Sequence, residues 1–108
     1  MDSIEEIEKR IDAFNKARDW DQFHTPANLA KSISIEAGEL LECFQWNEDD
    51  YDLDNVKEEL ADVMNYCFQL AMVLKVNPKE IIMTKMDKTE KKYPVDKAKG
   101  TSKKYYDL

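Results

Sequence analysis

Apolar residues recur along most of the chain every three or four positions, the spacing that places them on one face of a helix. The first such stretch begins with a capping box formed by Ser3 and Glu6 and ends near Arg18. The second begins with Thr25 as N-cap and Pro26 as the first helical residue. Its apolar stripe comprises Leu29, Ile33, Leu40 and Phe44. The first half of the chain is therefore predicted to form two helices.

The second half of the chain repeats this pattern and predicts two more helices. The third helix starts near Asp54. Its apolar stripe comprises Val56, Leu60, Val63, Cys67, Leu70 and Leu74. The fourth starts with Asn77 as cap and Glu80 as the acid of a second capping box. It must end near Tyr93, because Pro94 follows and cannot continue a helix.

Length and composition agree with a small helical protein. The chain has 108 residues, which suits a single domain over 1–108. Its two glycines and three prolines are too few for a fold of many strands and turns. Residues 95–108 are rich in lysine and tyrosine, and we expect this basic tail to become ordered only against another surface. These features predict an all-α domain.

No apolar run approaches the roughly 18 residues of a membrane span, and the first residues do not resemble a signal peptide. A cytoplasmic protein without a membrane partner is expected. The second and third helices are apolar on more than one side, since Ile35, Leu41, Met64 and Phe68 fall outside the main stripes. Such helices are buried on several faces. We therefore predict that the bundle is completed by a second copy of the chain, most simply as a two-fold dimer.

The net charge of −7 is unevenly distributed. Residues 1–78 contain 18 acidic and 7 basic residues, whereas residues 79–108 contain 5 acidic residues and 9 lysines. This asymmetry suggests an acidic body that collects metal ions, followed by a segment that favours phosphate. Nucleic acid is not an expected partner, because the body is acidic and the lysines form no broad surface.

Four carboxylates are candidates for a metal site. Glu36 and Glu39 on the second helix, and Glu59 and Asp62 on the third, form two pairs at a spacing of three residues, so each pair points in one direction. Glu36 also lies within the apolar stripe, where a carboxylate is costly unless a cation compensates it. Two such pairs offer hard oxygen ligands for Mg²⁺ or Mn²⁺. The alternative is a solvated acidic face of ordinary helices.

Several other metal or phosphate sites are excluded by residue type. The only histidine, His24, precedes the second helix, so neither a ferritin-like di-iron centre nor a histidine-rich zinc site can form. The two glycines in the chain exclude a glycine-rich phosphate loop.

Nearly the whole chain, from about Ile11 to Tyr105, resembles the MazG-like nucleotide pyrophosphohydrolases, and most closely the dCTP pyrophosphatase branch. The matching segments are, in order, Arg18 to Pro26, Asn28-Leu29, Glu36 to Glu42, Phe44 to Trp46, Glu59 to Asp62, Lys85 to Asp87 and Lys92 to Pro94. The resemblance implies an all-α homodimer or homotetramer. It also implies a magnesium-dependent reaction in which a nucleoside triphosphate and water yield the monophosphate and pyrophosphate, a reaction that cleans the nucleotide pool.

The resemblance also assigns roles to particular residues. The metal ligands would be Glu36, Glu39, Glu59 and Asp62. Either Glu36 or Glu39 would be the catalytic base that accepts the proton of the attacking water. The substrate-binding residues would be Trp20, Gln22, Phe23, His24 and Trp46 at the base, Tyr66 at the sugar, and Lys85 and Lys92 at the phosphates.

Two alternatives remain beside the dCTP reading. One is a non-catalytic helical dimerisation module, in which the acidic residues are merely solvated. The other is the same enzyme acting on modified nucleotides such as 5-substituted dCTP. The base and sugar preference, the number of metal ions and the choice between dimer and tetramer do not follow from the sequence.

Overall fold

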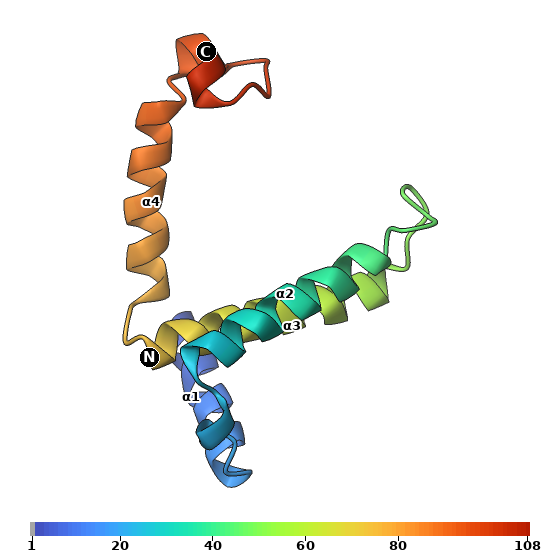
Figure 1. Ribbon diagram of the computed structural model, residues 1–108, viewed down its shortest axis with the longest axis vertical. Coiled ribbons are helices and arrows are strands. Elements are labelled where there is room, and N and C mark those ends of the chain that lie inside the picture. The colour runs from blue at the N-terminus through green and yellow to red at the C-terminus, as the bar shows by residue number, and fades with distance from the viewer. Residues whose placement is uncertain (1) are drawn as a thin grey trace. The chain divides into compact units, whose positions relative to one another are not determined.

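The computed structural model describes residues 2–108, and all regular secondary structure in that range is helical, without strands (Figure 1). The elements are α1 (Ser3–Ala17), η1 (Asp21–Phe23), α2 (Pro26–Glu42), α3 (Leu53–Val73), α4 (Pro78–Lys92), α5 (Val95–Ala98) and η2 (Tyr105–Asp107). The predicted all-α class with four main helices is confirmed. None of the helices in the described part of the chain is both long and apolar enough to cross a membrane.

Contacts divide the chain into two compact units, one ending at Val76 and the other comprising Asn77–Leu108. In the first unit α2 and α3 lie side by side along their length (Figure 1), and α1 also packs on α3. A connection of about ten residues joins α2 to α3, which makes them a helical hairpin. This hairpin is the frame that carries the candidate carboxylates. The single domain over 1–108 stays a prediction.

Side-chain caps set the helix starts. Oγ1 of Thr25 accepts a hydrogen bond from the backbone N–H of Asn28 at 3.2 Å, as predicted for the start of α2. The predicted cap at Ser3 is wrong. Oδ1 of Asp2 accepts from the N–H of Glu5 at 2.8 Å, so Ser3 is the first residue inside α1. An aspartate caps as well as a serine, and its negative charge is also favoured at a helix N-terminus.

The α2 helix ends at Glu42, two residues before Phe44, the last apolar position of its predicted stripe. Phe44 instead belongs to the turn that follows, where its ring lies 4.9 Å from that of Tyr51. The α3 helix begins at Leu53 with Asp52 as its cap, close to the predicted start. The hairpin connection is thus closed by an aromatic pair.

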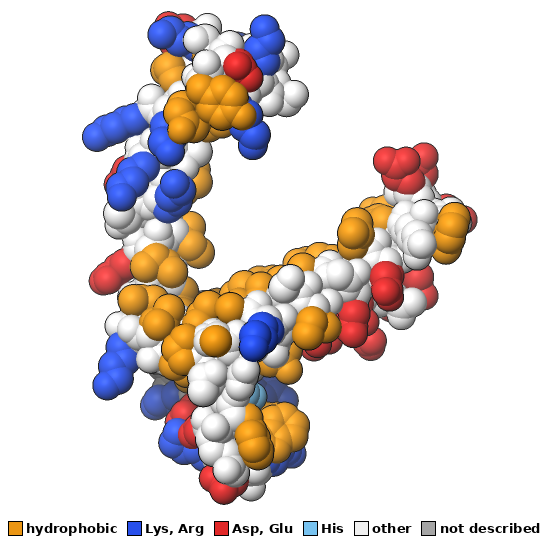
Figure 2. Space-filling model, viewed as in Figure 1, with side chains coloured by type: hydrophobic (Ala, Val, Ile, Leu, Met, Phe, Trp, Pro, Cys, Tyr) orange, Lys and Arg blue, Asp and Glu red, His pale blue; other side chains and the backbone are white. Residues whose placement is uncertain are grey.

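The core of the first unit is small. Leu29 in α2 is 0% exposed and Ala71 in α3 is nearly as buried, whereas Ile35 and Leu41 remain 63% and 71% exposed. Apolar side chains run along the visible face of α2 and α3 (Figure 2). Ile35 and Leu41 therefore have no covering partner among the described residues of the first unit. The predicted second copy would cover them, and dimerisation stays a prediction.

The second unit consists of α4 and the tail. Oδ1 of Asn77 accepts from the N–H of Glu80 at 3.1 Å, which is the predicted cap, and α4 ends one residue before Tyr93. The ring of Tyr105 lies 6.2 Å from that of Tyr93, and Nζ of Lys92 lies 4.7 Å from the centre of the Tyr105 ring. The tail is therefore ordered by contacts with the end of its own helix, whereas the sequence suggested a separate surface.

Candidate active site

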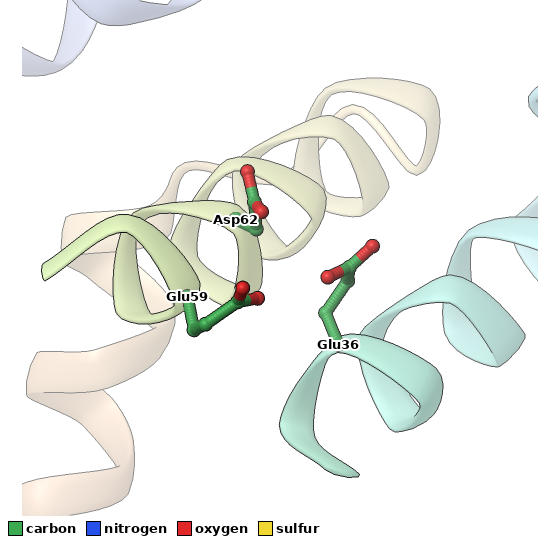
Figure 3. A group of neighbouring side chains, drawn as sticks. All are labelled: Glu36, Glu59 and Asp62. Atoms are coloured by element: carbon green, nitrogen blue, oxygen red, sulfur yellow. The ribbon is translucent and has the colours of Figure 1, made fainter. Parts of the chain in front are cut away.

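Three carboxylates converge between the helices of the hairpin. Glu36 points from α2 toward Glu59 and Asp62 on α3 (Figure 3). One oxygen from each of the three side chains lies within 4.8 Å of the others. The spacing of three residues brings Glu59 and Asp62 to one side of α3, and the packing of the two helices brings Glu36 opposite them. We call these three residues the carboxylate cluster.

The negative charges of the cluster are poorly compensated. A hydrogen bond shared with Glu39, together with burial and repulsion from the neighbouring carboxylates, raises the pKa of Glu36 from its ordinary value near 4.5 to about 7. Burial, and next the hydrogen bond with Glu39, also raise the pKa of Glu59. Oε2 of Glu36 and Oε2 of Glu59 are buried without a hydrogen-bond partner in the described residues. The cluster thus offers oxygen atoms that a cation would satisfy.

Glu39, the fourth predicted ligand, lies one turn along α2 from Glu36. It does not belong to the cluster of mutually close oxygens, and its side chain is exposed. Its hydrogen bond nevertheless makes the largest contribution to the shift of the Glu36 pKa. Glu39 is therefore a neighbour that acts on the cluster.

A cavity of about 610 Å³ adjoins the cluster and is lined by residues of α1, α2, α3 and the loop after α1. This volume is within the roughly 300–1,000 Å³ of small-molecule sites. Glu36 and Asp62 line the cavity, and so do Trp20, His24 and Tyr66, three of the predicted substrate-binding residues. Nδ1 of His24 is buried and has no partner within residues 2–108. Carboxylates and aromatic rings thus share one cavity.

The loop after α1 is fastened to that helix by both its backbone and its side chains. The N–H of Trp20 donates to the carbonyl of Asn15 at 3.0 Å. Nζ of Lys16 donates to Asp12 at 2.8 Å and to Asp21 at 2.9 Å. These hydrogen bonds with two carboxylates raise the pKa of Lys16 and keep it charged. The contacts turn the chain back at the end of α1 and bring Trp20 to the cavity.

Residues 31–108 match the sequence model of the MazG-like family. The chain is 35% identical to dCTP pyrophosphatase 1 of Bos taurus and 36% identical to that of Mus musculus, over 98% of this chain and 68% of each relative. The chain belongs to the MazG-like family. The crystal structure of a pyrophosphatase from Archaeoglobus fulgidus has 41% identity and a TM-score of 0.77, covering 87% of this chain and 94% of that one.

Not all base-binding residues expected of a MazG-like protein line the cavity. Trp46 follows α2 and is 84% exposed, and Phe23 in η1 is 59% exposed. Nε2 of Gln22 donates to the carbonyl of Asp19 at 2.8 Å and so holds its own loop. The roles of these three residues stay predictions.

The two predicted phosphate-binding lysines belong to the second unit. The carbonyl of Lys85 in α4 accepts a hydrogen bond from Oγ1 of Thr89 at 3.0 Å. Lys92, the last residue of α4, lies over the ring of Tyr105. Their roles toward the phosphates of a substrate also stay predictions.

The sequence did not identify four polar residues that line the cavity of this MazG-like chain, namely Arg10, Asn15, Asn65 and Gln69. A signal for two of them was present. Asn65 and Gln69 follow Asp62 at three and seven positions, so they extend the strip of α3 that carries the carboxylates. Asn15 gave the weaker signal of a polar residue at a helical spacing from apolar Ile11. The contact between α1 and α3 could not be predicted, because the two helices are far apart in the sequence.

Proposed function

We propose that this protein hydrolyses nucleoside triphosphates, with dCTP as the first candidate, to the nucleoside monophosphate and pyrophosphate. The observation that carries the proposal is the carboxylate cluster at a cavity that also contains Trp20, His24 and Tyr66. Membership of the MazG-like family and two relatives named dCTP pyrophosphatase 1 support it. Aromatic rings stack nucleobases, and carboxylates recruit the cation that a triphosphate requires.

The donors fit Mg²⁺, with Mn²⁺ as a substitute. Glu36, Glu59 and Asp62 supply hard oxygen atoms, and two of the side chains have a buried oxygen without a partner. Glu39 is the proposed fourth ligand. Its exposed side chain would contact the ion after a change of side-chain conformation. When bound there, Mg²⁺ would neutralise the triphosphate, orient its α-phosphate and lower the pKa of the attacking water.

The residues of the chain would accept the proton and bind the substrate. Glu36 or Glu39 would accept the proton as the water oxygen bonds to the α-phosphorus and the bond to the leaving pyrophosphate breaks. Trp20 and His24 would hold the base, and Tyr66 the sugar. Lys85 and Lys92 would contact the phosphates.

A substrate panel tests the proposed function. Pyrophosphate release is measured for each common ribo- and deoxyribonucleoside triphosphate and for 5-substituted dCTP, with Mg²⁺, with Mn²⁺ and with a chelator. We expect release from dCTP that depends on the metal ion. Release from a 5-substituted dCTP alone would identify a modified nucleotide as the substrate. If no compound released pyrophosphate, the proposed enzymatic function would be contradicted, and the non-catalytic helical dimerisation module would be the remaining alternative.

We also propose that the working protein is a homodimer or homotetramer. The exposed apolar side chains of α2 and α3 support this, because a monomer would leave Ile35, Leu41 and Met64 in water. Sedimentation at micromolar concentration should give a mass of two or more chains. A monomeric profile under these conditions would overturn the proposal. The Ile35→Lys variant should have a lower sedimentation mass than the wild type, closer to that of one chain.

A further inference from the structure

A chain of three amide side chains links α1 to α3 at the cavity. Nδ2 of Asn15 donates to Oε1 of Gln69 at 3.0 Å, and Nε2 of Gln69 donates to Oδ1 of Asn65 at 2.7 Å. Asn15 and Gln69 are only 6% and 7% exposed, whereas Asn65 is exposed. We call these three residues the amide relay. Two apolar side chains would fill the buried part without any need for hydrogen bonds, so packing alone does not require the relay.

All three members of the relay line the same cavity as Trp20 and Asp62. The cavity therefore combines an aromatic ring, carboxylates and amides. A nucleotide presents a flat base, a charged phosphate chain and a base edge with hydrogen-bond donors and acceptors. The ring suits the base, the carboxylates suit the cation that accompanies the phosphates, and the amides suit the edge.

The direction of the hydrogen bonds determines what Asn65 offers to a ligand. Its Oδ1 accepts from Gln69 and has a second lone pair, and both protons of its Nδ2 are free of the relay. The amide thus presents an acceptor beside a donor. An amino group beside an unprotonated ring nitrogen, as in cytosine, is complementary to this pair. In the same pose, uracil would place its carbonyl against Oδ1 and its N–H against Nδ2.

We infer that Asn65 reads the base edge, and that Asn15 and Gln69 are positioning residues that hold its amide in the orientation suited to an aminopyrimidine. The inference rests on the proposed function and identifies the residues that select the base within that site. Asn65 contributes the contact with the base. Gln69 fixes which side of that amide carries the oxygen, and Asn15 does the same for Gln69.

The direct test changes the donor of Asn65 into an acceptor. The Asn65→Asp variant removes the partner of the cytosine ring nitrogen and offers a new acceptor to the N–H of uracil. A bidentate amide–base pair discriminates by about 1–3 kcal/mol. We therefore expect the ratio of kcat/KM for dCTP to that for dUTP to fall about 10-fold or more, mainly through KM. The matched control is Asn55→Asp, the same change at an exposed position of α3 outside the cavity, and it should leave this ratio unchanged.

A second variant tests the positioning residues. The double change Asn15→Leu and Gln69→Met replaces both buried amides with apolar side chains of similar size, which costs little stability because no polar group is left unpaired there. The helical circular dichroism should persist while the dCTP to dUTP ratio falls toward one. A merely structural relay would change the melting temperature and leave the ratio intact, and that outcome would overturn the inference.

Binding separates the inference from the proposed function. Calorimetric titration with the non-hydrolysable α,β-imido analogues of dCTP and dUTP, in the presence of Mg²⁺, measures base selection without hydrolysis. Selective binding that Asn65→Asp abolishes would support the inference even if no pyrophosphate were released. Release of pyrophosphate with a base preference that neither variant alters would overturn the inference and leave the proposed function standing.

Discussion

The Glu36→Gln variant should lose at least about 100-fold of its magnesium-dependent pyrophosphate release, because it replaces a ligand oxygen and a candidate proton acceptor with an uncharged amide. Glu36 is the only member of the carboxylate cluster that comes from α2. In the variant, Glu59 and Asp62 on α3 no longer have a charged carboxylate opposite them on α2. The loss should therefore appear in kcat, and excess Mg²⁺ should not restore it.

The same variant should be more stable than the wild type in the absence of metal. The pKa of Glu36 is raised to about 7 in the folded protein, so the folded state binds this proton more tightly than the unfolded state. Stability of the wild type therefore falls as pH rises from about 4.5 to about 7, and the full penalty is present above that range. The variant lacks this penalty. Its melting temperature should exceed that of the wild type at pH 8, and the difference should vanish near pH 4.

A matched substitution separates charge in the cluster from charge on the helix. Glu42→Gln makes the same change at the exposed end of α2, outside the cluster, and should retain activity and show no gain in stability at pH 8. Full activity of Glu36→Gln would contradict the assignment of Glu36 to the site. Loss of helical circular dichroism in Glu36→Gln would show that Glu36 has a role in folding instead. We do not expect this loss, because the Glu36 side chain is only half-buried.

The Leu29→Ala variant should lose about 2–5 kcal/mol of stability, the usual cost of emptying a fully buried leucine site. Leu29 is the one large side chain that is completely buried among the described residues, and it lies where α2 packs in the first unit. Since small domains are stable by only about 5–15 kcal/mol, the change removes a large share of the total. Urea denaturation should show a lower midpoint with an unchanged slope.

Leu41→Ala is the control for this effect. It makes the same chemical change in the same helix, but the side chain is 71% exposed in the single chain. It should cost less than half as much in urea at low protein concentration, and any further cost should appear as weaker association between copies. Equal losses for the two variants would contradict the view that Leu29 is the centre of the core.

Local sequence was sufficient to predict the helices, because caps and helical spacing act within a few residues. Thr25 and Asn77 cap α2 and α4 as predicted. The error at Ser3 has the same origin, since Asp2 competes with it one residue earlier and supplies a charge that favours the helix start. The pairing of carboxylates within each helix was also predictable, because residues three apart share a face whatever the rest of the chain does.

Tertiary structure alone decided which side chains meet. The packing of α2 on α3 brings Glu36 against Glu59 and Asp62, and it leaves Glu39 beside that group. The return of the loop after α1 places Trp20 at the cavity and leaves Phe23 in solvent. These outcomes depend on distances between segments far apart in the chain.

The amide relay shows the same division. Asn65 and Gln69 are visible in the sequence as a continuation of the carboxylate strip, but Asn15 is 54 residues from Gln69, and only the packing of α1 on α3 joins them. The sequence by itself thus determined the all-α class, the helices and the candidate carboxylates, since these follow from contacts between neighbours in the chain. The tertiary structure decided the cluster, the cavity and the relay, because each requires side chains from at least two helices.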